Sequence, residues 1–370
     1  MGGPAASFGR PLPDFPWDRL VPAAERARAH PGGIVDLSVG TPVDPTPAIA
    51  RAALASTSDA PGYPLTAGSP VLREAIKRWA VQRLGASAEV GVLPTVGSKE
   101  LVGLLPSLLG LGAADTVAHP ALAYPTYEVG ALLAGARPVA ADEPAAAAGA
   151  RLVWLNSPAN PSGRVLDVAE LRAWVAAARA SGAVVVSDEC YLDFGWDAEP
   201  VSVLSPQVSG GRLDGLLAVH SLSKRSNLAG YRAALVAGDP SLVGRLLEIR
   251  KHAGLIVPAP VQAAMAACLD DQQHVDEQRG RYAARRAALR QGLEGAGFRI
   301  DHSEAGLYLW ATRDEPCWTT VDALAACGIL VAPGDFYGPA GQRHVRVALT
   351  ATDERVAQVP ERLAALAGLR

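Results

Sequence analysis

The chain has 370 residues, of which 49% are hydrophobic and 19% are charged, and its formal net charge is −3. This length suits one large domain with a smaller partner, and the composition is ordinary for a protein that buries a sizeable core. A net charge so close to zero gives no reason to expect nucleic acid or a membrane surface as a partner.

Targeting segments and metal sites are not expected from this sequence. Residues 1–10 lack the basic start and apolar run of a signal peptide. The most apolar stretch, residues 101–111, contains Pro106 and is shorter than the roughly 20 residues that a membrane span needs. The 4 cysteines are widely spaced without a CxxC pair, at Cys190, Cys268, Cys317 and Cys327. They predict reduced thiols in a cytoplasmic protein rather than disulfides or zinc ligands.

In chain order, a proline-rich arm is followed by a predicted helix at 18–29 and a strand at 34–39. The strand runs into a turn-rich loop, Gly40–Pro47. From there helices and strands alternate, which predicts a mostly parallel, doubly wound α/β sheet. The predicted helices are 71–84, 100–111, 126–136 and 168–181, and the predicted strands are 90–96, 115–118, 152–155, 183–187, 216–220 and 233–237.

After residue 260 the pattern changes. Residues 261–296 have the spacing of a long amphipathic helix, broken near Asp271, and strands are predicted at 298–300, 307–311 and 344–348. This combination of a long helix and separate strands predicts a smaller α+β domain. We therefore expect three parts: 1–43 as an N-terminal arm and part of the small domain, 44–260 as the large ligand-binding domain, and 261–370 as the small C-terminal domain. The alanine-rich residues 145–150 are expected to form a surface loop.

The most informative segment is Ser221–Ala234, which follows a predicted strand. Ligands of open α/β sheets bind at the carboxyl ends of the strands, so Lys224 would lie at that edge. A lysine there can form a Schiff base with a carbonyl cofactor. Ser221, Ser223 and Arg232 carry hydroxyl and guanidinium groups suited to a phosphate.

A second segment, residues 184–191, places an acid directly after a buried, β-branched strand. Burying a carboxylate is costly unless a cation pairs with it. A protonated pyridine nitrogen is such a cation, and its pairing with Asp188 would make a cofactor ring an electron sink. Tyr191 could donate a hydrogen bond to a phenolic oxygen on the same ring.

Four further motifs follow strands or lie inside one. Asn160 lies in a proline-rich loop and could present its amide to the same phenolic oxygen. Gly97, Ser98 and Lys99 open a helix whose free N–H groups attract a phosphate. Tyr124, directed by the proline after it, could stack on a ring, whereas Tyr127 is expected to pack inside the following helix. Arg346, inside a strand of the small domain, could bind a substrate carboxylate with two parallel hydrogen bonds.

Each motif alone has an ordinary alternative. The alternatives are an exposed lysine at Lys224, a metal-binding or helix-capping Asp188, a simple turn at Asn160, a plain helix cap at Ser98, core packing of Tyr124 and a solvent-facing Arg346.

Together these pieces resemble the class I/II aminotransferases of pyridoxal phosphate (PLP) fold type I. Every position of Ser221–Ala234 suits that family's lysine-site pattern, and the other pieces follow in the family's order from Gly40 to Arg346. The resemblance implies a PLP-dependent transaminase with a large, mostly parallel, PLP-binding domain and a smaller α+β domain. It also implies amino acid and 2-oxo acid substrates, no metal, and a homodimer with active sites at the interface.

The resemblance further implies residue roles. Lys224 would hold the cofactor and move protons, Asp188 would pair with the pyridine nitrogen, and Tyr191 and Asn160 would hold the phenolic oxygen. Arg346 and Asn160 would bind substrate. The implied phosphate ligands are Gly97, Ser98, Lys99, Ser221, Ser223 and Arg232, with Tyr63 reaching the phosphate from the neighbouring subunit. Tyr124 would stack on the ring, and Gly40 would lie near the substrate carboxylate.

Within the family, residues 37–47, 124–131 and 251–258 look like those of actinobacterial N-succinyldiaminopimelate aminotransferases. That likeness implies glutamate as amino donor in the diaminopimelate route to lysine, with Lys251 or His252 binding the distal carboxylate across the dimer. The competing interpretations are an aspartate- or aromatic-type aminotransferase, a C–S lyase on the same fold, and a PLP-sensing regulator without catalysis.

Overall fold

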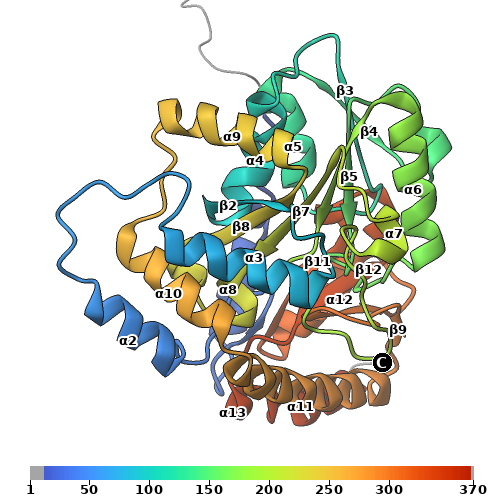
Figure 1. Ribbon diagram of the computed structural model, residues 1–370. Coiled ribbons are helices and arrows are strands. Elements are labelled where there is room, and N and C mark those ends of the chain that lie inside the picture. Colours follow the sequence, from blue (N-terminus) through green and yellow to red (C-terminus); the bar gives the residue numbers. More distant parts are fainter. Residues whose placement is uncertain (1–11, 368–370) are drawn as a thin grey trace, which may run out of the picture.

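The computed structural model describes residues 12–367, so residues 1–10, in which no signal peptide is expected, lie outside the described range. Its larger sheet has seven strands, and only β8 runs antiparallel to its neighbours (Figure 1). The strand order is β2 (Gly91–Val96), β8 (Ala233–Gly238), β7 (Leu216–Ser221), β6 (Val184–Asp188), β5 (Leu152–Asn156), β3 (Thr116–His119) and β4 (Arg137–Ala140).

Helices cover both faces of this sheet, because its inner strands are apolar on both sides. In β5, Val153 and Leu155 face one core, whereas Leu152 and Trp154 face the other. The first core contains helices α3 (Pro70–Leu84), α6 (Val168–Ser181) and α10 (Ala259–Asp270), and the second contains α4 (Ser98–Leu108), α5 (Thr126–Ala134) and α9 (Pro240–Ala253). The predicted doubly wound α/β sheet is confirmed.

The smaller sheet has five strands and a core of its own. Its order is β1 (Val35–Leu37), β11 (Ile329–Pro333), β12 (His344–Ala348), β10 (Tyr308–Thr312) and β9 (Arg299–Asp301). The helices α1 (Val21–Arg28), α11 (Gln273–Gly295), α12 (Cys317–Ala326) and α14 (Val359–Ala367) pack around it. Strand β1 thus pairs with a strand almost three hundred residues later, at Val35 and Ile329. The predicted domain boundaries at 43 and 260 stay a prediction.

Several short elements complete the chain. They are η1 (Pro16–Leu20), α2 (Ala48–Ser56), η2 (Pro144–Ala147), α7 (Pro206–Ser209), α8 (Leu222–Arg225), η3 (Ala229–Tyr231), η4 (Gly334–Tyr337), η5 (Pro339–Gly341) and α13 (Asp353–Val356). The expected loop at 145–150 begins inside η2, and the expected break near Asp271 separates α10 from α11. Within the described part of the chain, no helix combines the length and the apolar character that crossing a membrane requires.

Candidate active site

The largest group of predicted site residues lines one cavity of about 670 Å³, beyond the carboxyl ends of β5, β6 and β7. Strands from both sheets contribute to it, as do Phe15 and Trp17 from the N-terminal arm. The predicted residues gathered here are Gly40, Ser98, Lys99, Tyr124, Asn160, Asp188, Tyr191, Ser221, Ser223, Lys224, Arg232 and Arg346. Gly97 adjoins the cavity through Arg232, whereas Tyr63 is fully exposed and lies outside it.

Lys224 lies in the single turn of helix, α8, that follows β7. The hydroxyl of Ser221 caps this turn by accepting a hydrogen bond from the backbone N–H of Ser223 at 3.1 Å. The Lys224 amine donates to the carbonyl of Gly40, a residue of the loop after β1. Burial lowers the pKa of Lys224, because it disfavours the ammonium form. Lys224 therefore brings an amine into the cavity, and burial favours the neutral form of that amine.

Asp188 ends β6 and is 8% exposed. One carboxylate oxygen accepts a hydrogen bond from the Tyr127 hydroxyl at 2.9 Å, and the other accepts one from the backbone N–H of Cys190 at 3.2 Å. Burial nevertheless raises the pKa of Asp188, since these two hydrogen bonds only partly oppose the loss of water. The floor of the cavity thus carries an acid that a bound cation would stabilise in its ionised form.

Tyr127 corrects the expectation that this residue only packs inside its helix. Its ring is fully buried and stacks on Trp154 with centroids 5.0 Å apart, as a core residue would. Its hydroxyl, however, reaches the cavity and Asp188. Tyr124 lies beside it, with ring centroids 5.9 Å apart, and burial raises the pKa of Tyr124 to about 12.

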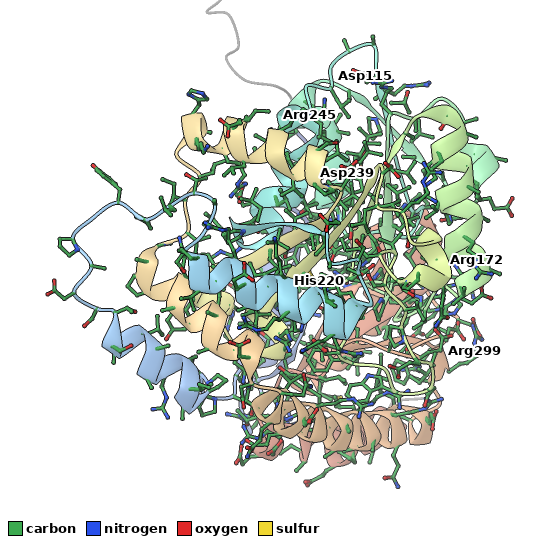
Figure 2. All side chains as sticks on the ribbon, in the orientation of Figure 1. Asp115, Arg172, His220, Asp239, Arg245 and Arg299 are labelled. Atoms are coloured by element: carbon green, nitrogen blue, oxygen red, sulfur yellow. The ribbon has the colours of Figure 1, made fainter. Side chains whose placement is uncertain are left out.

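A buried histidine and a buried glutamate lie close together in the large sheet. His220, labelled inside the molecule in Figure 2, has its Nε2 atom 3.1 Å from a carboxylate oxygen of Glu189. Both residues are buried. The His220 ring lies edge-on to the Trp79 ring, with the two ring centroids 4.8 Å apart. Arg172, Arg245 and Arg299 lie at the periphery in the same view. Ionisable side chains are therefore buried close to the strand ends that form the cavity.

Several groups that can bind an anion lie together at the start of α4. Gly97 precedes the helix with a φ of 80°, a backbone conformation that favours glycine. A Cβ atom at Gly97 would lie 2.1 Å from the Arg232 guanidinium, so only glycine allows this approach. Ser98 and Lys99 occupy the first turn, whose N–H groups no carbonyl of the same helix can reach. Guanidinium, hydroxyl and backbone donors converge here, as phosphate binding requires.

Arg346 comes from β12 of the small sheet and is 3% exposed. Its Nη1 donates to the side-chain oxygen of Asn160 at 2.9 Å, and its Nη2 donates to the carbonyl of Ser38 at 2.7 Å. Its guanidinium carbon lies 4.0 Å from the ring centre of Tyr308. Arg346 is therefore a held, buried cation beside Lys224, and the alternative of a solvent-facing arginine is wrong.

Tyr308 and Asn156 are cavity residues that the sequence did not single out. The Tyr308 and Tyr191 hydroxyls lie 3.0 Å apart, and a Cβ atom at Gly40 would lie 2.2 Å from the Tyr308 hydroxyl. Asn156 accepts a hydrogen bond from the backbone N–H of Asn160 at 2.7 Å and donates to the carbonyl of Asp188 at 3.0 Å. Asn156 thus orients Asn160. The position of Asn156 at the end of β5 is the feature of the sequence that could have identified it as a cavity residue.

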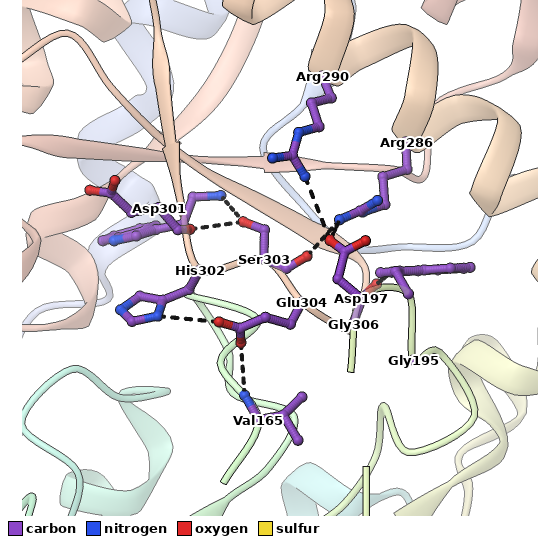
Figure 3. A network of polar contacts seen from close by, with 12 residues as sticks. Val165, Gly195, Asp197, Arg286, Arg290, Asp301, His302, Ser303, Glu304 and Gly306 are labelled. Carbon is purple, nitrogen blue, oxygen red and sulfur yellow. Dashed lines mark hydrogen bonds and ion pairs between the residues drawn. The ribbon is translucent and has the colours of Figure 1, made fainter. Parts of the chain in front are cut away.

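A network of polar contacts fixes the loop of Asn160 against the small sheet (Figure 3). The Glu304 carboxylate accepts from the backbone N–H of Val165 at 3.0 Å, and Arg286 of α11 donates to the Ser303 carbonyl at 3.0 Å. Gly163 packs so closely that a Cβ atom there would lie 2.6 Å from the carbonyl oxygen of Ala305. Loops from both sheets therefore set the position of Asn160 together.

Comparison with known proteins decides the family. The family model for aminotransferase class I and II matches residues 33–363. This chain belongs to the class I and II aminotransferases. The aminotransferase is 61% identical to the 4-dedimethylamino-4-oxo-anhydrotetracycline transaminase OxyQ of Streptomyces rimosus, over 96% of this chain and 99% of that protein. It is 60% identical to the probable aminotransferase Rv1178 of Mycobacterium tuberculosis, over 98% of this chain and 87% of that protein.

A solved structure shares the fold. A probable N-succinyldiaminopimelate aminotransferase from Thermus thermophilus superposes with a TM-score of 0.84 at 26% identity, covering 95% of this chain and 100% of that chain. The match to the class I and II family and the predicted fold type I agree, and enzymes of this family and fold depend on PLP. A transaminase is therefore favoured over the non-catalytic regulator.

The cavity of this aminotransferase fits PLP. The Gly97–Arg232 approach leaves a glycine-lined seat for a phosphate, and the buried Asp188 is placed for a cationic ring nitrogen. The amine of Lys224 lies in the same cavity, and an amine is the group that a Schiff base with an aldehyde requires. Among the described residues, no group of His, Cys, Asp and Glu side chains could hold a metal ion.

Proposed function

We propose that this PLP-dependent aminotransferase takes the amino group of glutamate and delivers it to N-succinyl-2-amino-6-oxopimelate, giving N-succinyl-LL-2,6-diaminopimelate for lysine biosynthesis. The observation that carries the amino acid chemistry is the buried Arg346, which shares one cavity with Lys224. The likeness to the Thermus thermophilus structure, named as a probable N-succinyldiaminopimelate aminotransferase, supports the specific acceptor.

Different residues of the cavity would bind different parts of the cofactor. Bound PLP supplies the aldehyde that receives the amino group and the ring that accepts the electron pair released at the substrate Cα. Asp188 would hold the ring nitrogen, Asn160 and Tyr191 the phenolic oxygen, and Tyr124 the ring face. The phosphate would be bound by Gly97, Ser98, Lys99, Ser221, Ser223 and Arg232.

Three residues would act on the substrate itself. Lys224 would hold the cofactor and would move the proton at the substrate Cα. Its pKa is lowered by burial, which favours the neutral amine that this step needs. Arg346 and Asn160, beside Gly40, would bind the α-carboxylate and so direct the Cα–H bond toward Lys224.

We further propose a cytoplasmic homodimer with shared sites. Tyr63 is fully exposed in the single chain and lies in the segment that extends outward between α2 and α3 (Figure 1). This exposure suits a hydroxyl that completes the phosphate seat of the partner subunit. Lys251 and His252 lie in the last turn of α9, where Lys251 pairs with Glu248 at 2.6 Å. We propose that Lys251 or His252 binds the distal carboxylate of the substrate across the dimer.

The alternative amino-group acceptor is a polycyclic ketone. It is favoured by the 61% identity to a transaminase whose name describes such a ketone. Phe15 and Trp17 line one side of the cavity, with ring centroids 5.6 Å apart. Flat aromatic walls of this kind suit a ring system, so a cyclic ketone acceptor is the alternative to the succinylated oxo acid.

An acceptor panel would test both assignments. The enzyme is first converted with glutamate, excess glutamate is removed, and return of the original cofactor absorbance is followed with each acceptor. We expect N-succinyl-2-amino-6-oxopimelate to react at least about tenfold faster than oxaloacetate or phenylpyruvate. Preference for a polycyclic ketone would assign the second function. Release of pyruvate and ammonia from cystathionine without an acceptor would identify a C–S lyase, and Lys224→Ala is the control without amino transfer.

A further inference from the structure

A second cavity, of about 330 Å³, lies outside the catalytic one. Its walls are residues 45–51, which lead into α2, and the first turns of α11. Arg225 and Asn227, which follow Lys224 in the chain, form part of its lining. Helix α8 packs against α11. The cavity therefore borders the turn that carries the catalytic lysine but belongs to no step proposed above.

Arg225 is the unusual residue in this cavity, because it is charged and only 3% exposed. Its Nε donates to Asp193 at 2.8 Å, but among the residues that the structure describes neither Nη1 nor Nη2 has a hydrogen-bond partner. Asp193 also accepts from Arg83 at 3.0 Å, so one carboxylate serves two guanidinium groups. A buried charged donor without a partner costs on the order of 1–3 kcal/mol or more, and this cost favours an anionic ligand.

Two more arginines line the same cavity, Arg51 and Arg281. Arg281 lies 3.8 Å from Asp44, but both Asp44 oxygens already accept from Arg285, at 2.7 and 2.6 Å. Asp44 therefore does little to neutralise Arg281.

The lining also includes two carboxylates. Asp271 accepts from the backbone and ring nitrogens of His274, at 3.1 and 2.5 Å, and Glu277 accepts from Gln273 at 3.0 Å. Three guanidinium groups thus face two carboxylates that have other partners, which leaves the cavity positive even with neutral His274.

Hydrogen bonds hold the walls of this cavity together. The Asn227 amide donates to the Pro45 carbonyl at 3.2 Å and to Gln278 at 2.9 Å, which ties the loop after Lys224 to both other walls. Asn227 has a φ of 51°, so its backbone turns sharply at this point. A site assembled in advance loses little conformational entropy when a ligand binds.

We propose that this cavity binds a small oxyanion, a phosphate or a carboxylate group, on the guanidinium groups of Arg225, Arg51 and Arg281. Guanidinium groups bind such oxygens in pairs. Arg51 and Arg281 are exposed at the cavity, and the two Arg225 Nη atoms lie buried in its wall without a partner among the described residues. The bound anion joins the α8 turn to α2 and α11, and it stabilises the folded chain by mass action.

Calorimetric titration of the holoenzyme with inorganic phosphate and, separately, acetate would test the proposal, at constant ionic strength maintained with chloride. PLP then occupies the first phosphate seat. We expect one saturable site per chain and a rise in Tm with anion concentration. Saturation by phosphate alone assigns a phosphate-bearing ligand, and saturation by acetate alone assigns a carboxylate-bearing one.

The variant Arg51→Ala/Arg281→Ala removes two exposed side chains, so the fold is retained, and the affinity should fall roughly tenfold or more. Arg245→Ala, an exposed arginine on α9 (Figure 2), is the matched control and should bind as the parent does. Absence of saturable binding by either anion, or equal binding by the double variant, would overturn the proposal.

Discussion

The two halves of the catalytic cavity hold buried charge in different ways. In the half built by the large sheet, burial raises the pKa of Asp188 and lowers that of Lys224, so both charged forms are disfavoured. In the half built by the small sheet, Arg346 is equally buried, but Asn160 and the Ser38 carbonyl accept its hydrogen bonds. We infer that the first half is completed by a resident cofactor, whereas the second is prepared for a substrate that comes and goes.

The largest expected effect is the loss of the covalent anchor. Lys224→Ala should reduce amino transfer by about 10⁴-fold or more, because it removes both the attachment and the proton carrier. Reduction with borohydride followed by peptide mapping should label the parent at Lys224 and leave the variant unlabelled. Lys77→Ala, on α3 and outside the cavity, is the matched control. A label on another lysine would contradict the assignment of Lys224, and with it the inference that this half of the cavity holds the cofactor.

Asp188→Asn should lower kcat by roughly 10²–10³-fold. The amide keeps the shape of the side chain but carries no charge to hold a protonated ring nitrogen. Cofactor retained after dialysis and kcat should be measured together. An unchanged kcat with full cofactor occupancy would show that the raised pKa of Asp188 has no part in the chemistry.

Arg346→Lys should raise KM for both glutamate and 2-oxoglutarate by roughly 10–100-fold, with a smaller change in kcat. A lysine keeps the charge but cannot reach Asn160 and a carboxylate with paired nitrogens. Initial rates across substrate concentrations would separate the two constants. Arg343→Lys, exposed just before β12, serves as control and should leave KM unchanged. Equal loss in kcat and none in KM would place Arg346 with the chemistry instead.

Tyr127→Phe should have the smallest effect, roughly a tenfold loss of kcat at neutral pH, since it removes one hydrogen bond to a charged group. The Tyr127 hydroxyl lowers the pKa of Asp188, so its removal raises that pKa further. Because the ionised carboxylate is the active form, the acidic limb of the pH–rate profile should move to higher pH. A profile that falls uniformly without moving would show that Tyr127 acts on the cofactor only through packing.

The sequence predicted most of the site because chemistry-bearing residues follow strands. Asp188 comes directly after an apolar run, and Lys224 lies in the short turn after the next strand. The carboxyl ends of these neighbouring parallel strands meet at one edge of the sheet. Arg346 was identifiable because an arginine within an apolar strand needs an anion or acceptors. The helix over Val168–Ser181 was predicted at its observed bounds, with a capping Asp167 before it.

Other features depended on information that the sequence pattern does not contain. All positions of β10 are buried, so alternation could not show that Tyr308 faces the cavity. The direction of the Tyr127 hydroxyl depends on the packing of its ring on Trp154. Helix α2 was not predicted, because it follows a segment rich in prolines. Strands β4 and β11 were not predicted either, although other strands of similar length were.

The close fit of Gly163 against the backbone of Ala305 has a consequence for how such an enzyme diverges. Any side chain at position 163 would push on the loop that carries Asn160, and through it on Arg346. Substitutions at the contact between Gly163 and Ala305 would therefore disturb carboxylate binding by Arg346 and Asn160 before they gave a new substrate preference. Phe15, Trp17 and Val39 line the same cavity, and we expect relatives with different acceptors to differ at these positions.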